Sequence, residues 1–110
     1  MNLDDAIERT RFLPTLVEGP NDKKALEKLG FTTIIVMQGP LYAIVEQIQH
    51  HEELALLVDL DAYGKKLYRY FYTELTKRGV KVNNEFRELL FSTPVRQIEG
   101  LVTYLEKVEA

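Results

Sequence analysis

The chain has 110 residues, of which 45% are hydrophobic and none is cysteine. This length suits one domain that buries its own core without disulfides or a cysteine-based metal site. No apolar run approaches the roughly 18 residues that span a membrane, and the acidic start differs from a signal peptide. The net charge of -3 argues against strong nonspecific binding to a polyanion. We therefore expect one soluble, cytoplasmic domain over residues 1–110, without a membrane partner.

The first half of the chain alternates short apolar runs with amphipathic segments. We expect strands at residues 12–17 and 32–37, and helices at 20–29 and 41–51. Pro20 suits a first helical turn, and Gly30 suits a helix C-terminal cap. Pro14 lacks a ladder donor, so it predicts a bend or gap early in the first strand.

The second half continues this alternation. We expect strands at residues 54–58 and 80–82, and helices at 63–78, 84–90 and 95–108. Gly79 ends the long helix, and a break near Pro94 separates the last two helices. Core motifs then occupy residues 13–82, and a helical C-terminal tail occupies 84–108.

Strands that alternate with helices require right-handed crossovers, which gives a parallel sheet with helices on both faces. An acidic signature follows the first strand and another follows the third. Neighbouring strands lie roughly 4.8 Å apart, so the two signatures can form one site only if these two strands are neighbours. The prediction is a single three-layer α/β, Rossmann-like domain of about four strands in the order 2-1-3-4. Its topological switch point falls between the first and third strands, where this fold class binds ligands.

The two acidic signatures are the most informative part of the chain. Glu18 and Gly19 follow the first strand, with Asp22 shortly after, and Asp59 and Asp61 follow the third. Residues two apart on an extended strand point the same way, so we expect both aspartates to face one point. Adjacent carboxylates repel unless a cation neutralises them, and oxygen ligands favour Mg²⁺, with Mn²⁺ as the alternative. We predict metal ligands at Glu18, Asp59 and Asp61.

Each of these residues also has a simpler interpretation. An aspartate at a strand end commonly caps the next helix. Gly64 is either an ordinary turn glycine or a residue whose missing side chain lets phosphate approach the helix start. Glu18 is a candidate general acid or base, or a ligand of a second ion. Asp22 is either a charge favoured by the helix dipole or an outer-sphere partner of the metal.

The segments at residues 16–22 (LVEGPND) and 58–64 (VDLDAYG) resemble the two motifs of the Toprim domain. This domain is shared by topoisomerases, bacterial primases, nucleases and the maturase of 5S ribosomal RNA. The resemblance implies that Glu18 is the acid/base group and that Asp59 and Asp61 are magnesium ligands. The tail, with Phe86-Arg87 and Ile98-Glu99, resembles that of small stand-alone Toprim proteins. The chain has no room for a cleavage domain, a zinc module or an ATPase, which argues against topoisomerase or primase activity by this chain alone.

The predicted helix at 63–78 is locally basic. Residues 62–81 contain six basic side chains and one acidic side chain, Glu74. Lys65 and Arg69, four apart on one face, are candidates to contact phosphate, although such charges often form a solvated face. Four tyrosines in the same segment either stack bases or belong to the core or an interface: Tyr63, Tyr68, Tyr70 and Tyr72.

These observations predict a magnesium-dependent phosphoryl-transfer protein acting on nucleic acid, namely a nuclease for structured RNA or DNA. Two alternatives stay open. One is a non-catalytic Toprim module that binds nucleic acid or a protein partner in a larger complex. The other is an enzyme acting on nucleotides with the same site. The apolar positions and tyrosines of the 63–78 helix are compatible with a homodimer surface.

Overall fold

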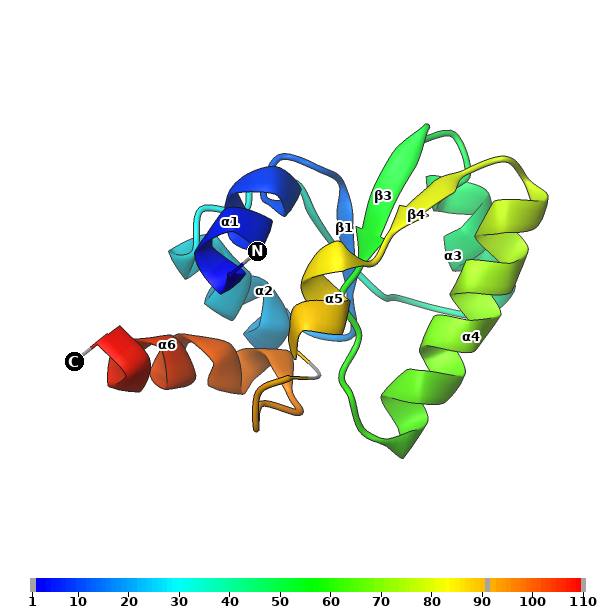
Figure 1. The fold of residues 1–110 in the computed structure, drawn as a ribbon. Coiled ribbons are helices and arrows are strands. Elements are labelled where there is room, and N and C mark those ends of the chain that lie inside the picture. Colours follow the sequence, from blue (N-terminus) through cyan, green and yellow to red (C-terminus); the bar gives the residue numbers. More distant parts are fainter. Residues whose placement is uncertain (1, 91, 110) are drawn as a thin grey trace.

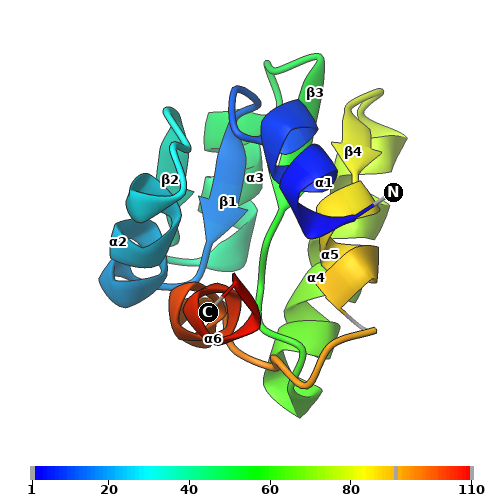
Figure 2. The ribbon, with the colours of Figure 1, turned by 60° about the vertical axis from the view of Figure 1, so that its left-hand side comes forward.

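Four short parallel strands form the centre of the molecule in the computed structural model, which describes residues 2–90 and 92–109 (Figures 1 and 2). The strands are β1 (Thr15–Val17), β2 (Ile34–Val36), β3 (Glu53–Leu56) and β4 (Lys81–Asn83). The helices are α1 (Leu3–Thr10), α2 (Pro20–Lys28), α3 (Leu41–Ile48), α4 (Ala62–Lys77), α5 (Glu85–Leu90) and α6 (Leu101–Glu109), with a 3₁₀ turn η1 (Ile98–Gly100).

The strand order is β2-β1-β3-β4, which confirms the predicted sheet topology. In the central strand β1, Thr15 pairs with Ile34 on one side and Ala55 on the other. All three residues of β1 are buried, because neighbouring strands and both helical layers cover it. The carboxyl ends of β1 and β3 therefore lie side by side, at the switch point of the sheet.

Two hydrophobic clusters fill the layers on either side of the sheet. One joins Leu16 and Leu56 to the buried stripes of α3 and α4, including Phe71, which has no exposed surface. The other joins Val17 and Leu57 to α1, α2, α5 and α6. Figure 2 shows α3 and α4 behind the sheet and the other helices in front of it. The three-layer α/β arrangement predicted from the sequence is confirmed.

Three differences from the sequence prediction have local causes. Helix α1 is absent from the prediction; the Asn2 side chain caps it by accepting a hydrogen bond from the Asp5 amide at 2.9 Å. Strand β1 begins only at Thr15, since Pro14 has no amide to donate, although its carbonyl accepts from Ala55 at 2.9 Å. The expected helix at 95–108 is a 3₁₀ turn from Ile98 followed by α6.

Strand β3 ends at Leu56, two residues earlier than the apolar run predicts. Leu57 and Val58 remain fully buried, and the Leu57 amide still donates to the Leu16 carbonyl at 3.0 Å. The chain then leaves the sheet towards α4. Within the described residues, no helix is long and apolar enough to cross a membrane.

Candidate functional site

A hydrogen bond connects the two acidic signatures across the carboxyl edge of the sheet. The Asp59 amide donates to Glu18 Oε2 at 2.7 Å, although the two residues are 41 positions apart. Glu18 directly follows β1, and Asp59 lies in the segment after β3, so the pairing of these strands brings them together. Their proximity agrees with the adjacency of strands one and three that the sequence predicts.

The C-terminal tail holds Asp59 from the opposite direction. The Ile98 amide donates to Asp59 Oδ1 at 3.0 Å, and the Leu60 amide donates to the Arg96 carbonyl at 2.7 Å. Both bonds fix the loop between β3 and α4 against the chain that enters η1. The tail is therefore part of the carboxylate edge, a role that the sequence interpretation missed because it depends on backbone groups.

Asp61 is the N-cap of α4. Its Oδ1 accepts a hydrogen bond from the Gly64 amide at 2.7 Å, which satisfies one of the unpaired amides at the helix start. Asp59 and Asp61 lie outside β3, so the expectation that an extended strand positions them is wrong. Each accepts from a different backbone amide, and the two carboxylates remain close enough to repel one another. The helix-cap alternative applies to Asp61, whose second carboxylate oxygen is not used in the cap.

Gly64 is required by a close backbone approach. A Cβ at this position would lie 1.9 Å from the carbonyl oxygen of Asp59, far inside any real contact. The space left by the missing side chain is thus filled by the Asp59 backbone, and the Gly64 amide is engaged by Asp61. The predicted role of Gly64 in admitting phosphate does not fit this packing, whereas a steric role linking α4 to Asp59 does.

Gly19 and Asp22 form the start of α2. Gly19 is the N-cap, and its amide donates to Asp22 Oδ2 at 3.0 Å. Asp22 is only 7% exposed, which is unusual for an aspartate. Its hydrogen bond and place in the first turn support the helix-start interpretation, and its carboxylate also lies close enough to interact electrostatically with Asp59.

Three carboxyl groups at this edge have raised pKa values. Burial is the largest cause of the raised pKa of Glu18, and repulsion from Asp59, Asp61 and Asp22 adds to it. Burial also raises the pKa of Asp22 and of Asp59. Glu99 of η1 repels both of those aspartates, and it is a member of the cluster that the sequence interpretation did not assign. The edge therefore holds closely spaced carboxyl groups whose ionisation is disfavoured.

The fit of a divalent cation depends on how many ligands the protein must supply. Among residues 2–90 and 92–109, no group of three or more His, Cys, Asp or Glu side chains is arranged to hold a metal ion. Mg²⁺ needs only one or two carboxylates, because water and substrate phosphates complete its shell. The oxygen-only donor set around Asp59 and Asp61 is suited to such an ion but does not form a closed cage.

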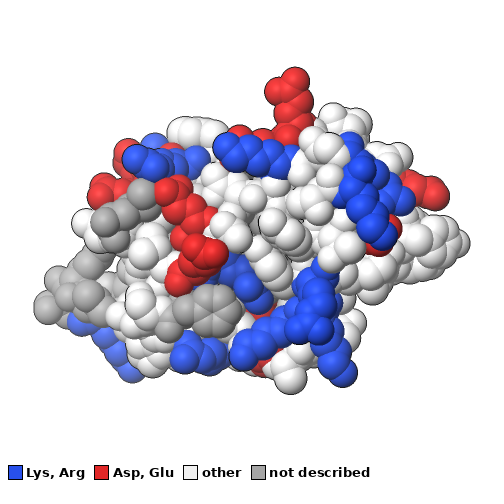
Figure 3. Space-filling view, turned by 45° about the vertical axis from the view of Figure 1, so that its right-hand side comes forward, with Lys and Arg blue, Asp and Glu red and all other residues white. Residues whose placement is uncertain are grey.

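Lys65 and Arg69 lie on the exposed face of α4. They line a hollow of about 310 Å³ together with Tyr68, Tyr72, Thr73 and Arg87. Figure 3 shows one group of basic side chains in the lower half of this face of the molecule and others along its upper edge, while most acidic side chains in view lie in the upper half. The structure thus joins the two predicted cations to an arginine of α5 that the sequence did not connect with them.

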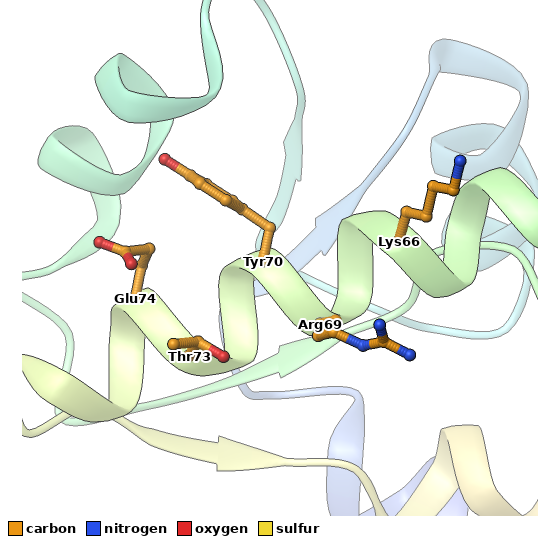
Figure 4. Close-up of a pocket in the computed structure, with 5 residues that line it drawn as sticks. All are labelled: Lys66, Arg69, Tyr70, Thr73 and Glu74. Atoms are coloured by element: carbon orange, nitrogen blue, oxygen red, sulfur yellow. The ribbon is translucent and has the colours of Figure 1, made fainter.

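A second hollow, of about 330 Å³, lies along the same helix and shares Arg69 and Thr73 with the first. Figure 4 shows Lys66, Tyr70 and Glu74 pointing to one side of α4 and Arg69 to the other. Glu74 forms salt bridges with Lys77 and Arg78, so the basic charge at the far end of α4 is partly neutralised. Positive charge is therefore concentrated towards the start of the helix.

The chain is similar to several archaeal proteins and to one solved structure. A UPF0292 protein of Methanocaldococcus jannaschii is 37% identical, over 86% of this chain and 79% of that protein. A UPF0292 protein of Thermoplasma volcanium is 31% identical, over 86% and 84%. A putative protein from Aquifex aeolicus has a TM-score of 0.76 and 30% identity, over 88% of this chain and 92% of that one. No protein-family model matches.

Proposed function

The chain belongs to the UPF0292 family, and we propose that it is a magnesium-dependent protein of phosphoryl transfer on nucleic acid, acting as a nuclease on structured RNA or DNA. The observation that carries this proposal is the Glu18–Asp59 hydrogen bond of 2.7 Å, which gathers the carboxylates at the switch point of a parallel sheet. The Toprim-like motifs at residues 16–22 and 58–64 support the same conclusion.

Each residue of the edge has a separable part in the proposed reaction. Glu18 exchanges the proton of the attacking water or the leaving oxygen, and its raised pKa brings the carboxyl closer to neutral pH, where it works best as an acid or base. Asp59 and Asp61 supply oxygens for Mg²⁺, and Ile98 fixes the orientation of Asp59. A bound magnesium ion would offset the negative charge of the scissile phosphate. Lys65 and Arg69 hold neighbouring phosphates.

The proposal is tested by cleavage of labelled structured RNA and DNA, with Mg²⁺ or with EDTA. Asp59→Ala and Asp61→Ala should abolish the Mg²⁺-dependent cleavage, and Glu18→Gln, which keeps an acceptor for the Asp59 amide, should reduce the rate about 10²- to 10⁴-fold. Asp4→Ala, which removes an exposed aspartate of α1 outside the two acidic signatures, serves as the control. Unchanged cleavage in both Asp59→Ala and Asp61→Ala would refute the proposal.

One observation favours a second candidate function, a non-catalytic module that binds nucleic acid or a protein partner in a larger complex. Oxygens of Glu18, Asp59 and Asp61 already accept backbone hydrogen bonds, as expected of carboxylates with a structural role. Under this alternative the purified chain binds nucleic acid without cutting it. Parallel reactions with single-stranded, duplex and structured substrates and with free nucleotides separate both candidates from a nucleotide-specific enzyme.

A further inference from the structure

The hollow between α4 and α5 has a lining of distinctive chemistry. It contains three cationic side chains, two tyrosines and one threonine, and no carboxylate: Lys65, Arg69, Arg87, Tyr68, Tyr72 and Thr73. Positions 65, 69 and 72 follow one another at helical spacing, so a single face of α4 presents them together. On a chain with net charge -3, such a lining concentrates positive charge at one place.

Arg87 forms the floor of this hollow. It is only 5% exposed, and its guanidinium carbon lies 4.0 Å from the centre of the Tyr68 ring. Tyr68 in turn accepts a hydrogen bond from Asn84 at 2.9 Å through its hydroxyl, which fixes the ring against the start of α5. The arginine and the tyrosine are therefore held in place before any ligand arrives, which lowers the entropic cost of binding.

An aromatic stack continues from this floor to the surface. Tyr68 and Tyr72 have ring centres 5.8 Å apart with an interplanar angle of 24°, and Tyr72 is 43% exposed. The stack therefore ends in an accessible aromatic ring beside Lys65 and Arg69, which form no salt bridge with any carboxylate among the described residues. Exposed aromatic rings beside cations are the combination that binds unpaired bases together with their phosphates.

We propose that this hollow is a subsite for single-stranded nucleic acid, with a base on Tyr72 and the adjoining phosphates on Lys65 and Arg69, over the charge of Arg87. A paired base is already stacked inside its duplex and has no face to offer, so the tyrosines select an unpaired segment. The inference rests on the proposed function in placing nucleic acid on this face. It adds the form of the substrate and a binding site separate from the carboxylates.

The test is fluorescence anisotropy of a labelled oligothymidylate of about twelve nucleotides, a length that covers the 4–16 nucleotides of typical single-strand sites. The titrations are made in EDTA, so that binding is measured without cleavage. We expect Tyr72→Ala to weaken binding roughly ten-fold, as for the loss of one stacked base. Lys65→Ala with Arg69→Ala should flatten the salt dependence by about 1.4 in log–log slope, for two lost phosphate contacts.

Matched variants separate the subsite from general effects of charge and of lost tyrosine surface. Lys24→Ala with Lys28→Ala removes two exposed lysines of α2, and Tyr42→Ala removes a tyrosine of α3 that is 64% exposed. Both controls should leave affinity within about two-fold of the wild type, the range usual for surface changes. Equal losses in the control and subsite variants would overturn the proposal, as would binding of duplex as tight as single strand, or no binding.

The binding and cleavage measurements distinguish failure of the subsite from failure of the catalytic proposal. Asp59→Ala should retain its affinity for the oligonucleotide in EDTA while it loses cleavage in Mg²⁺. Binding that depends on Tyr72 without any cleavage would support the subsite and reject the nuclease. Cleavage by the wild type, together with unchanged binding in Tyr72→Ala and in the Lys65, Arg69 double variant, would support the nuclease and reject the subsite.

Discussion

Replacing Gly64 with alanine tests the close contact between α4 and the backbone of Asp59. Gly64 lies in the first turn of α4, is buried, and does not have a positive φ. Backbone conformation therefore permits alanine there. The only obstacle is the Asp59 backbone, whose carbonyl oxygen and carbon would lie 1.9 and 2.6 Å from the new Cβ.

Two opposing terms decide the sign of the change in stability. Helix propensity alone favours alanine over glycine by about 1 kcal/mol. Overpacking a tight contact costs about 1–3 kcal/mol or more, and here the obstructing atoms are backbone and cannot rotate away. Because distances under 3.0 Å require displacement of one segment, we expect the upper part of this range. The net loss is then about 1–2 kcal/mol, which lowers the Tm by roughly 5–10 °C for a domain of this size.

Thermal unfolding followed by circular dichroism gives the Tm, and the chain offers a glycine for comparison. Gly100 in η1 does not have a positive φ, and a Cβ added there would meet no heavy atom of another segment within 4 Å. Gly100→Ala should therefore stay within about 0.5 kcal/mol of the wild type, as surface changes usually do. A Gly64→Ala protein as stable as the wild type, or more stable, would refute the steric reasoning.

Three other changes follow from the structure. The raised pKa of Asp22 means that the folded state disfavours the ionised carboxylate, so Asp22 lowers stability as the pH rises from its ordinary pKa of 3.8 through its folded pKa. Asp22→Asn should therefore raise the Tm at pH 7 but not near pH 3. A Tm difference that does not depend on pH would contradict this explanation. Mg²⁺ should raise the wild-type Tm by binding the folded state, and the shift should disappear in Asp59→Ala; an equal shift in both would place the ion elsewhere. Phe71→Ala should lower the free energy of unfolding, measured by chemical denaturation, by about 3–5 kcal/mol because Phe71 is fully buried. Phe12, which is 65% exposed, is the control. A loss in Phe71→Ala no greater than in Phe12→Ala would contradict the placement of Phe71 in the core.

The sheet was predictable from the sequence because its signals are local and agree with one another. Short apolar runs between amphipathic segments indicate parallel strands, and the need to bring Glu18 and Asp59 together selects the order β2-β1-β3-β4. That order places Glu18 close enough to Asp59 for the observed 2.7 Å bond between them. The strand order and the closeness of Glu18 and Asp59 can thus be predicted from the alternation of apolar and amphipathic segments and from the spacing between strands.

The details of the edge depend on contacts that leave no local pattern. The spacing of Asp59 and Asp61 indicates an extended strand, but β3 ends at Leu56, and Asp61 caps α4 instead. The role of Ile98 is carried by its backbone amide, which any residue except proline provides. Arg87 joins the hollow of α4 only because the fold brings the start of α5 to Tyr68. Such long-range backbone and packing relations cannot be read from spacing along one chain.

The hydrogen bonds from the tail to the loop after β3 have a consequence for the order of events in folding. The Leu60 amide donates to the Arg96 carbonyl, and the Ile98 amide donates to the Asp59 carboxylate. Ile98 lies 39 positions after Asp59 in the sequence. During synthesis, the sheet residues of β1 and β3 emerge well before this partner segment does. The carboxylate edge therefore reaches its final geometry only after residues 96–98 are available, so a nascent chain would form the sheet before it completes this edge.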